Sequence, residues 1–106
     1  MDVHDIMNKI RNGNFQDVKR FIPKNPDKID QTNLSGQTSL MVACEQGNIE
    51  LINLLVDTGA DLNMADRSHS TALHHAVWGR QLDALTTLIT QGSDVNRKDI
   101  NGYTPL

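Results

Sequence analysis

Four histidines and one cysteine are the side chains of this sequence that invite a search for a metal site. His69, His74 and His75 lie close together in the sequence, but neighbouring residues on a helix point about 100° apart, so His74 and His75 would not share one ion. No HExxH motif and no CxxC pair accompanies them. The sequence therefore predicts neither a metal site nor a cofactor.

Cys44 is the one thiol that could act as a nucleophile. It falls on the apolar side of a predicted helix, whereas a reactive thiol needs exposure and a lowered pKa. The sequence contains no glycine-rich phosphate loop and no GxSxG motif, and Glu45 and Glu50 flank a turn, where we expect both to be solvated. We therefore expect a protein that is not an enzyme. A single cysteine is compatible with a reducing compartment, which favours the cytoplasm, with the nucleus as the alternative.

Composition and charge exclude several classes of protein. Hydrophobic residues make up 38% of the chain and aromatic residues 4%, which suits a core of aliphatic helices better than one packed around large rings. No apolar run approaches the roughly 18 residues of a membrane span, and the charged N-terminus is not a secretory signal. The net charge of −3 gives no reason to expect nucleic acid as a partner.

The charges are unevenly distributed along the chain. Residues 1–32 hold six of the ten lysines and arginines, and residues 33–66 hold none. The acidic residues of that middle segment are Glu45, Glu50, Asp57, Asp61 and Asp66. Two interpretations remain open, a solvated acidic face or an acidic surface that steers a basic partner.

The elements that would position these side chains follow an internal repeat. Residues 33–65 align with residues 66–98, and residues 99–106 begin another copy. Eight positions are identical between the two full copies, among them Thr38/Thr71, Leu40/Leu73, Ala43/Ala76, Leu55/Leu88, Gly59/Gly92, Asp61/Asp94 and Asn63/Asn96. A fixed period of this length indicates a repeat array.

Hydrophobic spacing predicts two short helices in each unit. They are expected near residues 3–12 and 15–22, 37–46 and 49–57, and 71–79 and 81–91, with a turn projecting around Ala65-Asp66. In the middle unit we expect Leu40, Ala43 and Cys44 to be buried in the first helix, and Ile49, Ile52, Leu55 and Val56 in the second. Because such pairs cannot bury their apolar faces alone, the sequence predicts an all-α solenoid of stacked antiparallel helix pairs.

In this pattern the units resemble ankyrin repeats over residues 3–106. The family pattern D-x-x-G-x-T-P-L-H-x-A, a glycine turn and G-A-D-V-N is matched by Gly36, Thr38, Leu40, Ala43, Gly47, Gly59, Ala60, Asp61 and Asn63, and by Asp66, Thr71, Leu73, His74, Ala76, Gly92, Asp94, Val95 and Asn96. The resemblance implies projecting β-turn or hairpin loops, and a structural role for His74, bonded to the neighbouring loop. The sequence departs from the pattern at His69, which occupies a glycine position, and at Arg80, which replaces the glycine between the helices. We expect Gly79 to take the strained position there.

The repeat divides the chain into an N-terminal capping repeat (1–32), two full repeats (33–65 and 66–98) and the start of a truncated repeat (99–106). We predict a non-catalytic module that binds a protein partner through its loop tips and concave helical face. The alternative is a regulatory or targeting arm of a larger multidomain enzyme or channel, favoured because the chain stops inside the opening of a repeat. Leu85, Leu88 and Ile89 would then lack a cover, which predicts weak self-association.

The resemblance also implies which residues contact a partner, namely those at the loop tips and on the exposed side of each first helix. By position these are Leu34, Ser35, Gln37, Glu45, Gln46, Arg67, Ser68, Ser70, Trp78, Ile100, Asn101 and Tyr103. Trp78, the single tryptophan, aligns with Glu45, an exposed polar position. It is either an interface anchor or a cover for apolar surface near the Gly79-Arg80 turn.

Overall fold

Six α-helices and two short 3₁₀ turns make up the regular structure of the computed structural model, which describes residues 1–106 and contains no strand. In chain order these are α1 (Val3–Arg11), α2 (Phe15–Phe21), η1 (Ile22–Lys24), η2 (Pro26–Lys28), α3 (Ser39–Gln46), α4 (Ile49–Thr58), α5 (Ala72–Trp78) and α6 (Leu82–Thr90). Each helix begins and ends within two residues of the sequence prediction. The all-α repeat architecture is therefore confirmed.

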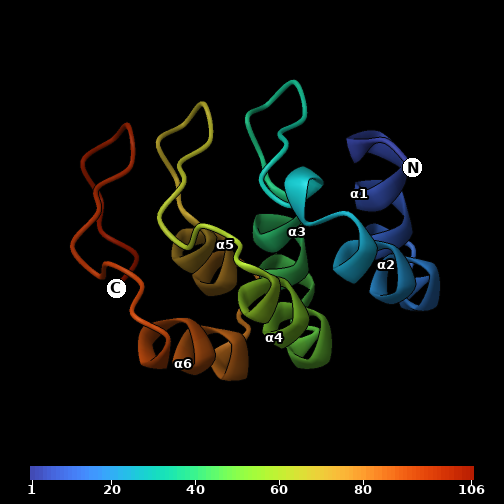
Figure 1. Cartoon of the computed structure of the whole chain (residues 1–106). Helices are drawn as coiled ribbons and strands as arrows, with labels where there is room; N and C mark the ends of the chain where they lie inside the picture. The colour runs from blue at the N-terminus through green and yellow to red at the C-terminus, as the bar shows by residue number, and fades with distance from the viewer.

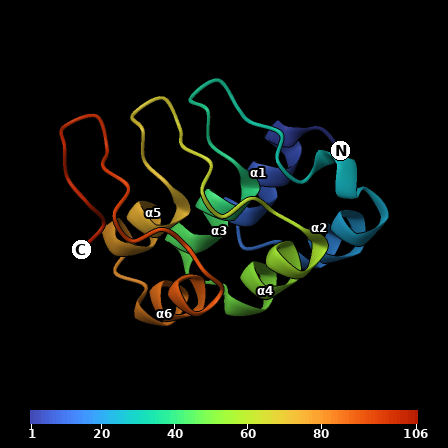
Figure 2. The ribbon, with the colours of Figure 1, turned by 60° about the vertical axis from the view of Figure 1, so that its left-hand side comes forward.

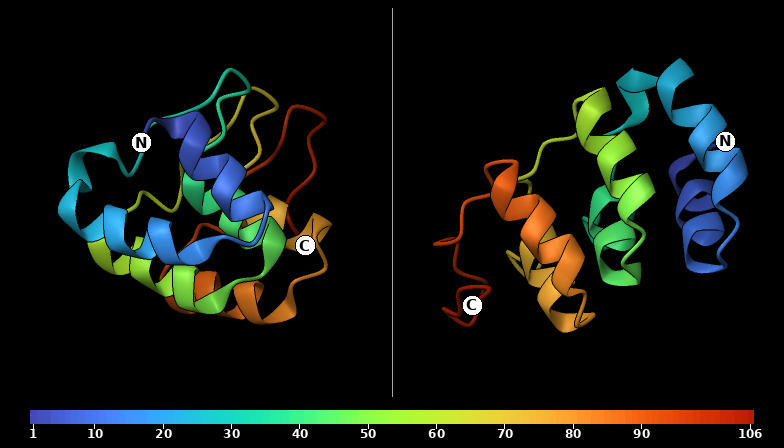
Figure 3. Two further views of the ribbon diagram at one scale, coloured as in Figure 1. Left: turned by 90° about the vertical axis from the view of Figure 1, so that its right-hand side faces the viewer. Right: turned by 90° about the horizontal axis from the view of Figure 1, so that it is seen from below.

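The helices form two rows that run along the stack (Figure 1). The inner row is α1, α3 and α5, and the outer row is α2, α4 and α6; both rows are seen from below in Figure 3. Three loops project from the inner row on the same side (Figures 1 and 2). We call them finger 1 (residues 29–38), finger 2 (residues 60–71) and finger 3 (residues 93–104).

α3 lies at the centre of the core because α1 and α5 pack on either side of it. Six consecutive residues of this helix, from Ser39 to Cys44, are buried, including the expected Leu40, Ala43 and Cys44. Its start is fixed by Thr38, whose hydroxyl accepts a hydrogen bond from the amide of Met41 at 3.3 Å.

In α4 the buried positions differ in part from the prediction. Ile52 and Leu55 are buried as expected, whereas Ile49 and Val56 are only half-buried, and Leu51 is buried instead. The reason is that α4 contacts α2 and α6 as well as α3, so its buried face is wider than the stripe of an isolated helix pair and is centred on Leu51 and Leu55.

The same side-chain bond shapes the tip of every finger. Asn33, Asp66 and Asp99 each accept, through Oδ1, hydrogen bonds from the amides two and four residues later, at 2.9–3.0 Å. The turns therefore lie after these residues, at 34–36, 67–69 and 100–102, and the expectation of a turn around Ala65-Asp66 was wrong by two residues. An Asx side chain that captures the following amides opens a turn and does not sit at its centre.

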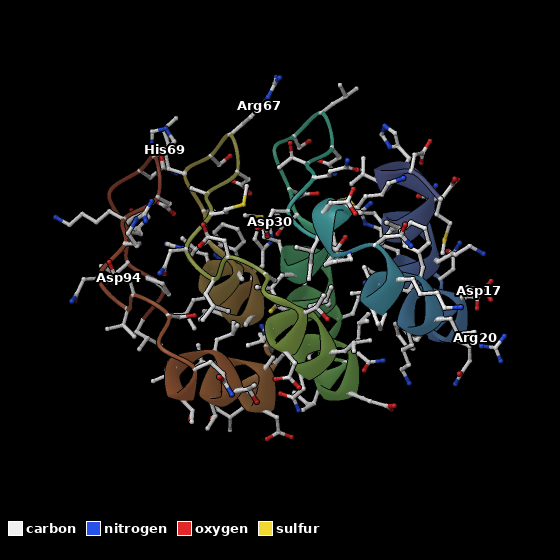
Figure 4. The ribbon with its side chains drawn as sticks, in the orientation of Figure 1. Asp17, Arg20, Asp30, Arg67, His69 and Asp94 are labelled. Atoms are coloured by element: carbon white, nitrogen blue, oxygen red, sulfur yellow. The ribbon has the colours of Figure 1, made fainter.

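Two residues other than glycine have a left-handed backbone. His69 has φ 58° at the tip of finger 2, where Gly36 and Gly102 have φ 76° and 82°, so it does occupy a glycine position (Figure 4). The expectation for Gly79 was wrong, because Arg80 takes the left-handed conformation with φ 56° and Gly79 is helical with φ −77°. Gly79 is needed for space, since a Cβ there would collide with the carbonyl oxygen of Glu45.

The fingers are also bonded to one another near their tips. The amide of Arg67 donates to the carbonyl oxygen of Ser35 at 3.0 Å, and the amide of Ile100 donates to that of Ser68 at 2.8 Å. These bonds hold finger 2 against finger 1 and finger 3 against finger 2. The three loops therefore form one continuous platform.

Candidate protein-interaction surface

The predicted contact residues fall into two groups on the folded chain. Leu34, Ser35, Gln37, Arg67, Ser68, Ser70, Ile100, Asn101 and Tyr103 lie on the fingers, and Glu45, Gln46 and Trp78 lie at the ends of α3 and α5. Ser70 is fully buried, so it does not belong to an accessible surface. Gln37 is half-buried, and its Oε1 accepts hydrogen bonds from Arg11 and Asn33. The other residues are exposed or partly exposed.

A row of three exposed residues lies along the finger tips. Leu34, Arg67 and Ile100 occupy the same position of successive fingers, and the side chains of Leu34 and Ile100 are 78% and 61% exposed. Arg67 projects outward from the tip of finger 2, and no carboxylate pairs with it (Figure 4). Apolar residues with this exposure do not contribute to the core and are available to a partner.

Trp78 lies at the end of α5 with 52% of its surface exposed. Its ring centroid is 5.2 Å from that of His75 in an edge-to-face arrangement, and 5.8 Å from that of His74. The indole thus packs on histidines of its own helix, and about half of it remains open to solvent.

His75 is the functional candidate that sequence reasoning missed. It is buried, and its Nε2 donates to Oδ2 of Asp66 at 2.9 Å. Its Nδ1 lies 3.7 Å from Oε1 of Glu45 and has no hydrogen-bond partner. The imidazole therefore links finger 2 to α5 and lies beneath Glu45. No periodic signal could reveal this, because the matching residue of the preceding repeat is Val42.

His74 has the structural role that the resemblance implied. Its Nδ1 accepts a hydrogen bond from the amide of Thr71 at 3.1 Å, and its Nε2 donates to the carbonyl oxygen of Tyr103 at 3.0 Å. Finger 3 is therefore attached to the start of α5. In the preceding repeat the corresponding residue is Met41, whose sulfur lies 3.4 Å from the amide of Thr38 and makes no comparable bond to finger 2.

Three of the five acidic side chains of residues 33–66 are engaged within the chain. Glu50 pairs with Lys19 at 2.9 Å, Asp66 is engaged with His75 and its own loop, and Asp61 accepts the amide of Asn63. Glu45 remains at the inner row with 40% of its side chain exposed and with no lysine or arginine partner. On the inner row, a basic partner would therefore meet the carboxylate of Glu45.

Two grooves lie at opposite ends of the stack. One, of about 440 Å³, is lined by charged residues of α1 and α2 with Phe21. The other, of about 390 Å³, lies between α5, α6 and the last residues, and includes Leu82, Leu85 and Leu106. No three of the histidine, cysteine and acidic side chains are arranged to hold a metal ion. None of the helices is long and apolar enough to cross a membrane.

The Cys44 thiol is fully buried in α3. Burial removes the thiolate from water and raises the pKa of Cys44 to about 12. A thiol in this state is not a nucleophile near neutral pH.

Comparison with known proteins agrees with this architecture. The model of the family described as ankyrin repeats matches residues 6–99 in three copies. The chain is 38% identical over 101 residues to ankyrin repeat and SAM domain-containing protein 6 of Rattus norvegicus, covering 94% of this chain and 11% of that protein. It is 37% identical over 95 residues to SH3 and multiple ankyrin repeat domains protein 1 of Homo sapiens, covering 89% and 4%. It is also 38% identical over 73 residues to potassium channel AKT1 of Oryza sativa, covering 67% and 8%. The chain thus spans about a tenth or less of the length of these relatives.

Proposed function

Since the chain belongs to the ankyrin repeat family, whose arrays are in general protein–protein interaction modules, we propose that it binds a protein partner through its fingers and the exposed ends of its inner helices. One observation carries the proposal. Of the seven large hydrophobic residues that are exposed, four lie on this surface: Leu34, Trp78, Ile100 and Tyr103. Large exposed aromatic and aliphatic residues are the usual anchors of interfaces.

The hydrogen bonds that hold the fingers in place support the proposal. The bonds between finger tips, His74 below finger 3 and His75 below finger 2 hold the loops in place before a partner arrives. A surface that is already ordered loses less conformational entropy on binding.

Affinity capture with matched variants tests the proposal. The wild-type chain and a Trp78→Ala, Tyr103→Ala double variant are immobilised, and bound proteins are quantified by mass spectrometry. We expect specific partners to be retained by the wild type and depleted on the double variant, with Trp78→Ala alone weakening the affinity by at least about 2 kcal/mol. Leu82→Gln, in the groove between α5, α6 and the last residues, serves as the control and should retain them.

The outcome that contradicts the proposal is a capture profile that no surface substitution changes. Thermal unfolding of each variant must accompany the experiment. If Trp78→Ala binds normally but unfolds at a much lower temperature, the residue is structural.

A second candidate, a regulatory or targeting arm of a larger enzyme or channel, is favoured by the relatives. They are several times longer than the matched region, and one of them is a potassium channel. Sequencing the complete transcript tests this candidate. A reading frame that continues into a catalytic or membrane domain would support it, and a stop codon directly after Leu106 would contradict it. We propose a cytoplasmic or nuclear location, which imaging of a fluorescent fusion would check.

A further inference from the structure

The ends of α3 and α5 are held unusually close together. Gly79 allows this approach, because a Cβ at that position would collide with the backbone of Glu45. The Nε2 amide of Gln81 also donates to the carbonyl oxygen of Glu45 at 3.3 Å. Glu45 and Trp78, which occupy the same position of successive repeats, are therefore neighbours on the inner row.

The imidazole of His75 lies next to both of these side chains. Oε1 of Glu45 lies 3.7 Å from its Nδ1, and the indole of Trp78 contacts it edge to face. The carboxylate and the indole thus flank one buried ring while each remains about half exposed. We call this pair the Trp78–Glu45 corner.

The local charge at the corner favours a cation. Both α3 and α5 end here, and a helix C-terminus carries partial negative charge that adds to the carboxylate of Glu45. Of the basic side chains on neighbouring elements, Arg11 of α1 bonds Gln37 and Lys19 of α2 pairs with Glu50. Arg80, in the turn after α5, forms no ion pair with Glu45. His75 approaches Glu45 only at 3.7 Å, while its Nε2 is bonded to Asp66.

We propose that the Trp78–Glu45 corner receives an arginine side chain of the protein partner, an inference that rests on the proposed binding function. The guanidinium stacks on the exposed indole face and donates hydrogen bonds to the carboxylate of Glu45. Arginine fits better than lysine, because its planar group can stack and bond in two directions at once. Phosphate-bearing ligands do not fit, since the carboxylate repels them.

The single tryptophan makes the corner directly observable, because the intrinsic indole fluorescence of the protein comes from Trp78 alone. Short peptides of sequence Gly-Arg-Gly, capped at both ends, are titrated against the intact chain, with Gly-citrulline-Gly as the uncharged isostere. We expect the arginine peptide to change the fluorescence and to bind roughly tenfold more tightly than the citrulline peptide. Added salt should weaken this binding.

Matched variants locate the interaction. Glu45→Gln removes the charge at constant shape and should abolish the preference for arginine over citrulline. Glu50→Gln removes a carboxylate of the outer row and should leave the preference intact. If Glu45→Gln lowers the unfolding temperature, Glu45→Asp, which keeps the charge on a shorter side chain, must restore at least part of the preference.

Selection of binders from a displayed library of random peptides separates this inference from the proposed function. Arginine enriched in the selected peptides, and lost when Glu45→Gln is the bait, supports the inference. Peptides that lack arginine and ignore Glu45→Gln, yet fail to bind Tyr103→Ala, overturn the inference and leave the interaction module standing. Equal binding of the arginine and citrulline peptides also overturns it. No binders to the wild-type chain would count against both proposals.

Discussion

Gly79 and Arg80 are adjacent residues. The position of Gly79 has no space for a side chain, whereas Arg80 has the left-handed backbone conformation that favours glycine. Arg80 has a left-handed backbone, and this conformation destabilises the folded state by about 1–2 kcal/mol for a residue with a side chain. Glycine would remove this strain, but its greater conformational entropy in the unfolded state would offset roughly 0.4–1 kcal/mol of the gain. Arg80→Gly should therefore raise the free energy of unfolding by about 0.5–1 kcal/mol, measured by urea denaturation. Gly79→Ala should lower it by about 1–3 kcal/mol, because the new methyl group meets the backbone of Glu45.

The contrast between the two variants is the control. If Arg80→Gly destabilised the chain, Arg80 would not hold the left-handed conformation, and if Gly79→Ala were tolerated, the backbone of Glu45 would not lie against Gly79. The sequence could not decide this, because the collision at Gly79 involves the backbone of the preceding repeat.

Cys44 should resist thiol reagents in the folded protein. Iodoacetamide at pH 8 should label it only after unfolding in urea, which mass spectrometry would detect. Stoichiometric labelling of the folded chain on the time scale of a free thiol would contradict the burial of this residue.

The raised pKa of Cys44 also has a consequence for stability at alkaline pH. The unfolded thiol loses its proton first, near its ordinary value of 9.0, whereas the folded thiol keeps its proton until the pH approaches about 12. The contribution to stability is thus fully present below pH 9 and declines as the pH rises between these values. The free energy of unfolding of the wild type should fall more steeply with pH in this window than that of Cys44→Ala. Parallel curves would show that the thiol is solvated.

At the scale of the element, a hydrogen bond joins α5 to finger 3, but no corresponding bond joins α3 to finger 2. His74 donates to the carbonyl oxygen of Tyr103, whereas Met41 makes no such bond to the corresponding oxygen, that of Ser70. Met41→His should supply the missing hydrogen bond and raise the free energy of unfolding by about 1 kcal/mol. Hydrogen exchange in finger 2 should slow as well.

The control for this change is Met41→Leu, which keeps the volume but adds no donor. It should leave hydrogen exchange in finger 2 unchanged. If Met41→His lowered the stability while Met41→Leu did not, the imidazole would not fit between α3 and finger 2.

The elements themselves were largely predictable, because the spacing of apolar residues determines which face of a short helix is buried. The exceptions have one cause, which is contact between repeats. Leu51 is buried because α4 has neighbouring helices on both sides. The contacts of His75 with Asp66 and Glu45 join residues of α5, finger 2 and α3, and the spacing of apolar residues within one helix does not predict such contacts. The repeat alignment was enough to match Trp78 with the exposed position of Glu45, whereas the contact between the two repeats was needed to place Trp78 beside Glu45.

At the scale of the whole molecule, the apolar surface of α6 differs from the rest of the outer row. Leu82 and Ile89 are exposed, and Leu85 is half-buried beside the groove between α5, α6 and the last residues. We expect the 106-residue chain to self-associate weakly through this surface, with an apparent mass in sedimentation that rises with concentration. Leu82→Gln combined with Ile89→Gln should keep it monomeric, whereas Leu34→Gln on finger 1 should not.

A related experiment covers the surface without changing it. Adding a complete capping helix pair after Lys98 should raise the midpoint of thermal unfolding by several degrees, because the cap buries apolar area of α6. If capped and uncapped chains unfold at the same temperature as monomers, the surface is already adequately covered.

The bonds between neighbouring finger tips also constrain how the length of this chain can vary. The amide of Ile100 meets the carbonyl oxygen of Ser68, and the amide of Arg67 meets that of Ser35, so each tip must reach the same height as the one before it. One residue inserted into a single tip would move its donor or acceptor out of register with both neighbours. The tips can therefore exchange the exposed side chains at positions 34, 67 and 100 but tolerate insertions and deletions poorly. The turns of residues 22–28, which lie away from the finger tips, are where added length would be accepted.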